Sequence, residues 1–266
     1  MNVDEYHKLA EVEDRMWYFR ALHRHVELRL VEALGEGTSE ILDAGCGTGG
    51  LIARLGARHP AWRWSGVDLS EVACGLAQRR FGRVATATAT SELPAPELDS
   101  TGPKICRGDV TRLPFPDASF DAIVSADVLY HVDDDAAALR EFQRVLRPGG
   151  VVVVNVPAYR WLWSYHDDAV HSRRRYDRQE VIGKFEAAGL GKIKATYWNT
   201  LPFPLVVVRR KLLPAPRGGS DVHLFPGPIE NGFDVAMAAE RTWLRAFGRL
   251  PFGTSVLATG MKPAEP

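Results

Sequence analysis

One short stretch near residue 40 constrains the fold of this chain more than any other. Ile41 and Leu42 have the apolar character of a buried strand, and residues 51–55 have the pattern of a helix start. Between them lies a Gly-x-Gly-x-Gly turn formed by Gly45, Gly47 and Gly49. Strand, glycine turn and helix in this order are typical of the nucleotide-binding corner of an open α/β sheet. Glycine suits the turn because a ligand approaches the backbone closely there.

An acidic residue beside this turn distinguishes between classes of ligand. Asp43 lies two residues before the first glycine. A carboxylate there would repel a pyrophosphate but attract an ammonium or sulfonium group, so the sequence favours a cationic nucleoside over a dinucleotide. With this aspartate, the segment 41–49 resembles the first motif of the class I S-adenosylmethionine (SAM) dependent methyltransferases.

The composition narrows the range of partners. The 266 residues contain 33 basic and 33 acidic side chains, so no global field attracts nucleic acid or anionic lipid. Three cysteines without a C-x-x-C pair argue against structural zinc. The longest apolar run, 201–208, is too short to span a bilayer, and the N-terminus lacks an apolar signal core. We therefore expect a cytoplasmic protein without a nucleic-acid partner or a membrane span.

The rest of the chain repeats strand and helix patterns in the order of a doubly wound sheet. We expect an α/β fold with a mostly parallel, seven-stranded sheet. Expected strands after the first lie at 62–68, 104–109, 120–124, 151–154, 192–198 and 254–259, and expected helices at 4–34, 71–81, 133–146, 178–189 and 234–250. We predict one methyltransferase domain over 1–266, with an N-terminal helical lid (1–38), a SAM-binding core (39–156), and acceptor-side insertions (157–178 and 200–252). A further insertion, 85–103, carries no predicted chemistry.

A second aspartate supports a nucleoside ligand. Asp68 ends the second strand, nineteen residues beyond Gly49, a spacing from which a carboxylate reaches a ribose hydroxyl pair. The family resemblance implies that Asp109 and Val110 meet the adenine, although Asp109 has an alternative role as a cap of the next turn. The residues that we predict to bind the cofactor are Asp43, Gly45, Cys46, Gly47, Gly49, Asp68, Leu69, Asp109, Val110, Ser125 and Ala126.

Aromatic and basic side chains after the fifth strand suggest an acceptor site. Four rings alternate at Tyr159, Trp161, Trp163 and Tyr165, and an extended chain would place them on one side as a wall. The run Arg173, Arg174 and Arg175 is either a solvated helix start or a clamp for an anion. Trp17 and Tyr18 either pack their helix on the sheet or cover the cofactor. A second basic run, 209–211, reads as solvated.

Several side chains could accept a proton from the acceptor. Our candidates are His131, Tyr159, His166, His171 and Tyr176. A metal site formed by His166, Asp167 and His171 is disfavoured, because a spacing of five does not share one helix face. We therefore predict no metal.

These observations lead to an expected function. The resemblance implies transfer of a methyl group from SAM to a small-molecule acceptor, and the arginines suggest one with a carboxylate or phosphate head. One alternative is C-methylation of a small prenyl diphosphate such as isopentenyl diphosphate, with residues 173–175 as the diphosphate clamp. Another is a SAM-binding module without catalysis. The insertion at 200–252 either covers the acceptor pocket or forms a dimer surface. In the second case we expect a homodimer.

Overall fold

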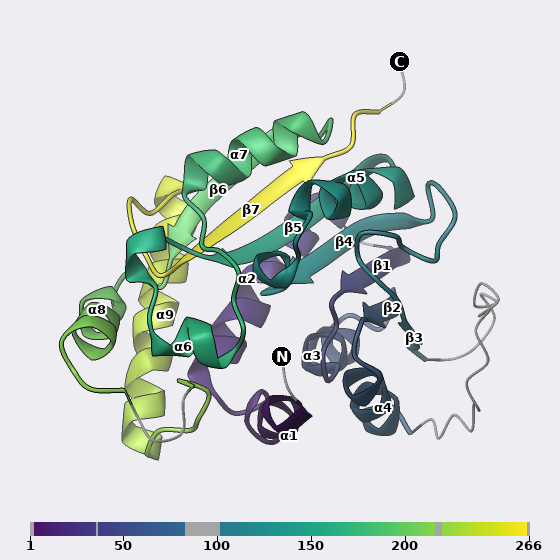
Figure 1. Cartoon of the computed structure of the whole chain (residues 1–266). Coiled ribbons are helices and arrows are strands. Elements are labelled where there is room, and N and C mark those ends of the chain that lie inside the picture. Colours follow the sequence, from purple (N-terminus) through teal and green to yellow (C-terminus); the bar gives the residue numbers. More distant parts are fainter. Residues whose placement is uncertain (1–2, 36, 83–101, 216–219, 265–266) are drawn as a thin grey trace.

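The sheet of the computed structural model has seven strands, and the structure describes residues 3–35, 37–82, 102–215 and 220–264 (Figure 1). The strand order is β3-β2-β1-β4-β5-β7-β6, and only β7 runs antiparallel to its neighbours β5 and β6 within this sheet. The strands are β1 (Ser39–Ala44), β2 (Trp62–Asp68), β3 (Lys104–Arg107), β4 (Phe120–Ala126), β5 (Leu146–Pro157), β6 (Gly191–Trp198) and β7 (Ser255–Met261). The predicted doubly wound, mostly parallel fold is confirmed.

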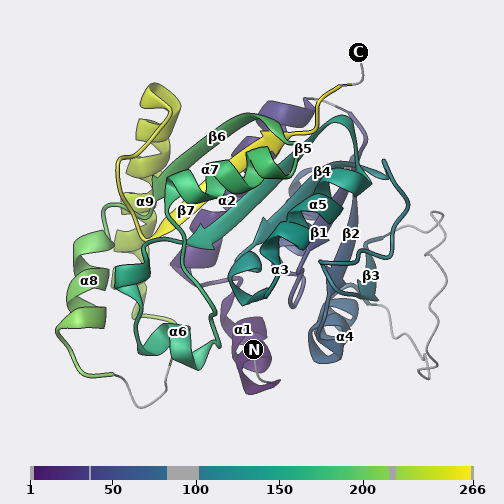
Figure 2. The same ribbon diagram turned by 45° about the horizontal axis from the view of Figure 1, so that its top comes forward.

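Helices cover both faces of the sheet, as Figures 1 and 2 show. One buried cluster joins the sheet to Phe142 and Phe185, and the other joins its opposite face to Leu30, Ile52 and Met237. The helices are α1 (Val3–Val12), α2 (Trp17–Leu34), α3 (Gly50–Arg58), α4 (Glu71–Arg80), α5 (Asp135–Val145), α6 (Tyr165–Ala169), α7 (Arg178–Ala187), α8 (Phe203–Lys211) and α9 (Gly227–Phe247), with short 3-10 helices η1 (Leu129–His131) and η2 (Arg160–Leu162).

The part of the chain after β5 differs from the prediction in three helices. Helices α6 and α8 were not predicted, and the helix that we expected from residue 234 begins at Gly227 as α9. Pro228 stands at the start of the helix, where the missing N–H is tolerated because it has no intrahelical acceptor. Most of the insertion at 85–103 lies outside the described residues. Among the described residues, no helix has the length and hydropathy needed to cross a bilayer.

The glycine turn after β1 is built around a close packing contact. Gly45 has φ of 90°, and its amide donates to the carbonyl of Val67 at 2.7 Å. A Cβ on Gly45 would lie 2.2 Å from Cγ2 of Val128, which no real contact permits. Gly45 is therefore required both for its dihedral angle and for its lack of a side chain.

We expect Gly45→Ala to lower the free energy of unfolding by about 2 to 5 kcal/mol, because left-handed strain and overpacking each cost about 1 to 3 kcal/mol. Denaturant titration measures the loss. The matched control is Gly227→Ala in the first turn of α9, where nothing lies within 4 Å of an added Cβ. Adding Val128→Ala to Gly45→Ala should restore part of the stability. Equal stability of the two single variants would contradict this account.

Candidate functional site

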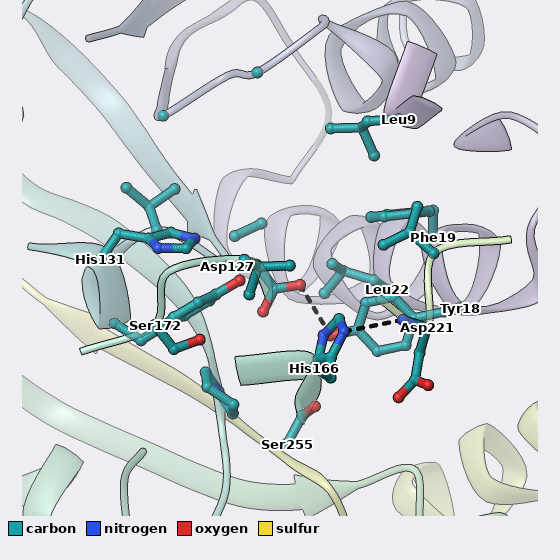
Figure 3. Close-up of a pocket in the computed structure, with 18 of the residues that line it drawn as sticks. Leu9, Tyr18, Phe19, Leu22, Asp127, His131, His166, Ser172, Asp221 and Ser255 are labelled. Carbon is teal, nitrogen blue, oxygen red and sulfur yellow. Dashed lines mark hydrogen bonds between the residues drawn. The ribbon is translucent and has the colours of Figure 1, made fainter. Parts of the chain in front are cut away.

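A cavity of about 1110 Å³ lies at the carboxyl ends of the central parallel strands (Figure 3). Its floor includes the ends of β1, β2 and β4, and α1 and α2 contribute Leu9 and Tyr18 from above. The wall on the far side comes from α6, α8 and the segment 221–225. The described cavity thus joins the glycine turn to the late insertions, as expected for a cofactor site that continues into an acceptor site.

Two buried carboxylates mark the cofactor half. Asp43 and Asp68 line the cavity and are only 3% and 8% exposed. Burial, together with the charges of Asp68 and Glu13, raises the pKa of Asp43 to about 8. Burial also raises the pKa of Asp68, although its oxygens accept hydrogen bonds from the amides of Gly47 (2.9 Å) and Ser70 (2.8 Å). A cation bound beside Asp43 would relieve the cost of ionising it.

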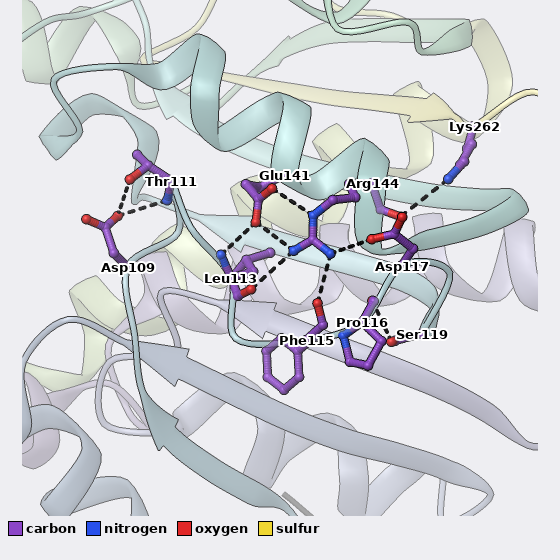
Figure 4. A network of polar contacts seen from close by, with 10 residues as sticks. All are labelled: Asp109, Thr111, Leu113, Phe115, Pro116, Asp117, Ser119, Glu141, Arg144 and Lys262. Carbon is purple, nitrogen blue, oxygen red and sulfur yellow. Dashed lines mark hydrogen bonds and ion pairs between the residues drawn. The ribbon is translucent and has the colours of Figure 1, made fainter. Parts of the chain in front are cut away.

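Asp109 follows the third strand and takes the capping role that we held as its alternative. Its exposed carboxylate accepts from both the amide and the hydroxyl of Thr111 at 2.8 Å (Figure 4). Asp109 and the buried Val110 nevertheless line the cavity. The loop that follows is held by Arg144, which donates to the carbonyls of Leu113 and Phe115.

The structure brings together more than half of the residues that we predicted for the site. Those that line the cavity are Trp17, Tyr18, Asp43, Gly45, Cys46, Gly47, Asp68, Leu69, Asp109, Val110, Ala126, His131, His166, Arg173 and Arg175. Those that lie outside it are Gly49, Ser125, Tyr159, Trp161, Tyr165, His171, Arg174 and Tyr176. Gly49 instead caps α3 with φ of 81°, and Ser125 is fully buried in β4.

The predicted aromatic wall is wrong because the segment is not extended. Tyr159 has φ of 61°, and the chain then forms η2 and α6. Tyr159 stacks on Tyr197, and Trp161 is half exposed on the outer surface. Tyr165 is turned towards Asp221, to which its hydroxyl donates at 2.7 Å. Alternation in the sequence therefore did not place the rings on one side.

Each arginine of the predicted clamp has a carboxylate partner in the structure. Arg173 pairs with Asp133 at 2.6 Å, and Arg174 pairs with Asp135 at 3.3 Å. The pair between Arg175 and Asp167 (2.7 Å) is almost fully buried. An anion at this run would have to compete with these carboxylates.

Two of the proton-acceptor candidates are unsuited by their surroundings. Tyr176 is buried and donates to Asp135 at 2.8 Å, which raises its pKa further than burial alone. His171 is exposed, and its carbonyl faces the ring of His131. Neither side chain reaches the cavity.

Two of the four histidines that line the cavity, His131 and His166, expose opposite hydrogen-bonding groups. Nδ1 of His166 accepts from the amide of Asp221 at 3.1 Å, so Nε2 of the neutral ring carries the proton and is a donor (Figure 3). In His131, Nδ1 contacts the carbonyl of His171 at 3.3 Å, which leaves a lone pair on Nε2. Burial lowers the pKa of both rings to about 4, so both are neutral at pH 7.

Asp127 is a possible proton acceptor that the sequence analysis missed. It follows β4 with φ of 58° and lines the cavity. One oxygen accepts from Tyr18 at 2.9 Å (Figure 3). The other accepts from Asn155 at 2.8 Å, and Asn155 in turn accepts from Trp198 at 2.7 Å. Burial raises the pKa of Asp127 to about 6. No cationic side chain of the described residues pairs with it. Its place just after a strand end was the available signal.

A second missed group is the basic run that we read as solvated. Arg209 and Arg210 line the cavity. Arg210 is only 11% exposed in its side chain and pairs with Asp221 at 3.0 Å, while Arg209 lies over the ring of Tyr165. The helical turn of α8 explains the error, because consecutive residues in a helix point in different directions.

Comparison with known proteins agrees with this geometry. Residues 42–154 match the methyltransferase domain family. A probable S-adenosylmethionine-dependent methyltransferase of Mycolicibacterium smegmatis is 27% identical over 248 residues, which cover 86% of this chain and 85% of that protein. The malonyl-[acyl-carrier protein] O-methyltransferase of Dechloromonas aromatica is 36% identical over 182 residues, which cover 65% of this chain and 60% of that protein.

A solved structure shows the same fold. The SAM-dependent methyltransferase of Thermotoga maritima superposes with a TM-score of 0.56 at 19% identity, over 98% of this chain and 96% of that one. The glycine corner, the strand-end carboxylates and these matches agree. Residues 42–154 therefore form a methyltransferase domain, and the chain is similar over most of its length to a SAM-dependent methyltransferase.

Proposed function

We propose that this enzyme transfers the methyl group of SAM to an oxygen or nitrogen of a small-molecule acceptor, with Asp127 as the proton acceptor. The observation that carries this proposal is the carboxylate of Asp127, which faces the cavity without a cationic partner among the described residues. The name of the Dechloromonas aromatica relative supports oxygen as the methylated atom.

The residues of the cofactor half fit SAM. Asp43 would face the positively charged methionine end, and Asp68 would accept from the ribose hydroxyls. Val110 supplies an apolar contact for the adenine, beside Asp109. A Cβ on Gly47 would point towards Leu9 at 3.8 Å, so glycine leaves room there between the turn and α1. When bound, SAM supplies an activated methyl group on a positively charged sulfur.

The work of the protein is then to orient the acceptor and to take its proton. Orientation alone contributes about 7 to 11 kcal/mol when reacting atoms are held in line. A base works best when its pKa is near the working pH. Asp127, with a pKa of about 6, meets this condition better than His131, with a pKa of about 4. Tyr18 and Asn155 hold the carboxylate in one orientation.

The far wall of the cavity supports an acceptor with an anionic head. His166 presents an N–H donor, and Arg210 brings a positive charge that Asp221 only partly neutralises within a shared hydrogen-bond network. Ser172 adds a hydroxyl at the same wall (Figure 3). These groups replace residues 173–175 as our proposed head-group site.

We expect SAM binding to release about 0.9 proton from Asp43 at pH 7, because a group with a pKa of about 8 is about 90% protonated there and a bound cation favours its ionised form. Affinity should therefore rise between pH 6 and 7.5. Calorimetry in buffers of different ionisation enthalpy measures the release.

The matched variant is Asp43→Asn, which keeps the shape and removes the charge. It should bind SAM about 10- to 150-fold more weakly, as expected for a lost charge-assisted hydrogen bond, and release no proton from this site. Unchanged affinity together with unchanged proton release would rule out this role for Asp43.

We expect Asp127→Asn to lower kcat by about 10²- to 10⁴-fold, the usual contribution of a general base. The measurement uses an acceptor found by mass-spectrometric screening with labelled SAM. In the native enzyme the rate should fall below a pH near 6, because protonated Asp127 accepts no proton, and the variant should lack this inflection. A variant that binds SAM normally and turns over at the native rate would refute the assignment.

Tyr18→Phe tests the same network with the ring retained. The hydroxyl of Tyr18 donates to Asp127 and lowers its pKa, so its removal should move the inflection to higher pH. An inflection that stays in place or moves lower would show that another group titrates. If no acceptor is methylated in the screen while SAM binds, the non-catalytic module becomes the better account.

A further inference from the structure

Helix α8 differs from every other helix of the described residues, because none of its residues is buried. It lies at the edge of the molecule (Figures 1 and 2). Large apolar side chains on and around it are nevertheless exposed. These are Trp161, Leu201, Leu205, Val208, Leu212, Leu213 and Phe252, which we call the α8 face. An exposed apolar area of this kind marks an interaction site more often than chance packing.

The α8 face is continuous with the acceptor cavity. Leu205, Val208 and Leu213 are exposed to solvent and also line the cavity. Phe203 of α8 contacts the two aromatic residues of the face, since its ring centroid lies 6.1 Å from that of Trp161 and 5.5 Å from that of Phe252. The cavity wall formed by α8 is therefore also an outer surface of the protein.

The charge of this region has one sign. From residue 201 to residue 215 the sequence contains three Lys or Arg, at 209–211, and no Asp or Glu, and Arg210 pairs with Asp221. Arg209 and Lys211 lie in the last turn of α8, next to Leu212, and Lys211 is exposed. The whole chain is neutral, so this local excess of positive charge is not a reflection of composition.

We propose that the α8 face docks on an anionic lipid surface, with its aliphatic and aromatic side chains in the interface and its cations against the head groups. Aliphatic residues, interfacial aromatics and basic residues on one face are the features of peripheral membrane helices. A second copy of the chain fits less well, because a two-fold interface would bring the same cations together. The proposal does not depend on the acceptor or on methyl transfer.

One consequence rests on the proposed function. If the acceptor cavity opens against a bilayer through α8, the acceptor is an amphiphile whose apolar tail contacts Leu205 and Val208 and whose anionic head reaches His166 and Arg210. This consequence fails separately from docking, because vesicle binding is measured without an acceptor.

The test is co-sedimentation of the full chain with vesicles of phosphatidylcholine containing about 30% phosphatidylglycerol, compared with phosphatidylcholine alone. The native protein should bind the anionic vesicles, and about 0.5 M salt should release it, because exposed charges are screened at that ionic strength. Leu212→Asp, at a side chain 74% exposed, should weaken binding at least about tenfold. Lys211→Glu should weaken it about 30-fold, since each basic residue near the surface contributes about 1 kcal/mol.

Matched controls lie on other faces of the molecule. Val31→Asp, at a side chain 45% exposed on α2, and Lys192→Glu, at the start of β6, should bind like the native chain. Docking is overturned if the native protein ignores anionic vesicles or if all four variants bind equally. It is also overturned if the native protein sediments as a dimer, Leu212→Asp sediments as a monomer, and neither protein binds vesicles. The α8 face would then bind a second copy of the chain.

Discussion

The proposed site depends on carboxylates that form no ion pair with a cationic side chain among the described residues. Asp43, Asp68 and Asp127 follow or end three strands, β1, β2 and β4, whose carboxyl ends meet at one edge of the sheet. Each has a pKa raised by burial, which is the cost of keeping a charge where water is scarce. A bound ligand can offset such a cost, which supports these three positions as the proposed cofactor and acceptor site.

Other buried acids of the described residues show the contrast. Asp167 pairs with Arg175, and Asp135 pairs with Lys184 and Arg174, so these acids stabilise the fold rather than a ligand. The same pairs engage Arg174 and Arg175 of the arginine run with buried acids of the fold.

The sequence predicted most of the fold and the cofactor half because both depend on local order. Apolar runs predict the strands, and Asp43, Gly45 and Asp68 lie within one consecutive strand–turn–helix–strand unit. The acceptor half depends on contacts between distant segments. Asp127 acquires its partners from residues 18 and 155, and Arg210 acquires its partner from residue 221. Pairings between residues so far apart leave no signal in the local sequence.

The aromatic segment shows how a local pattern can mislead. Alternation predicts an extended chain only if nothing interrupts it, and here Tyr159 turns the chain with a positive φ while Ser164 and Asp167 form a capping box that starts α6. The rings of residues 159, 161 and 165 are thereby turned away from the cavity, and the aliphatic residues of α8 take their place in its wall. If this cavity holds the acceptor, its aliphatic outer wall and polar inner end favour amphiphilic molecules, with an apolar part and a polar part.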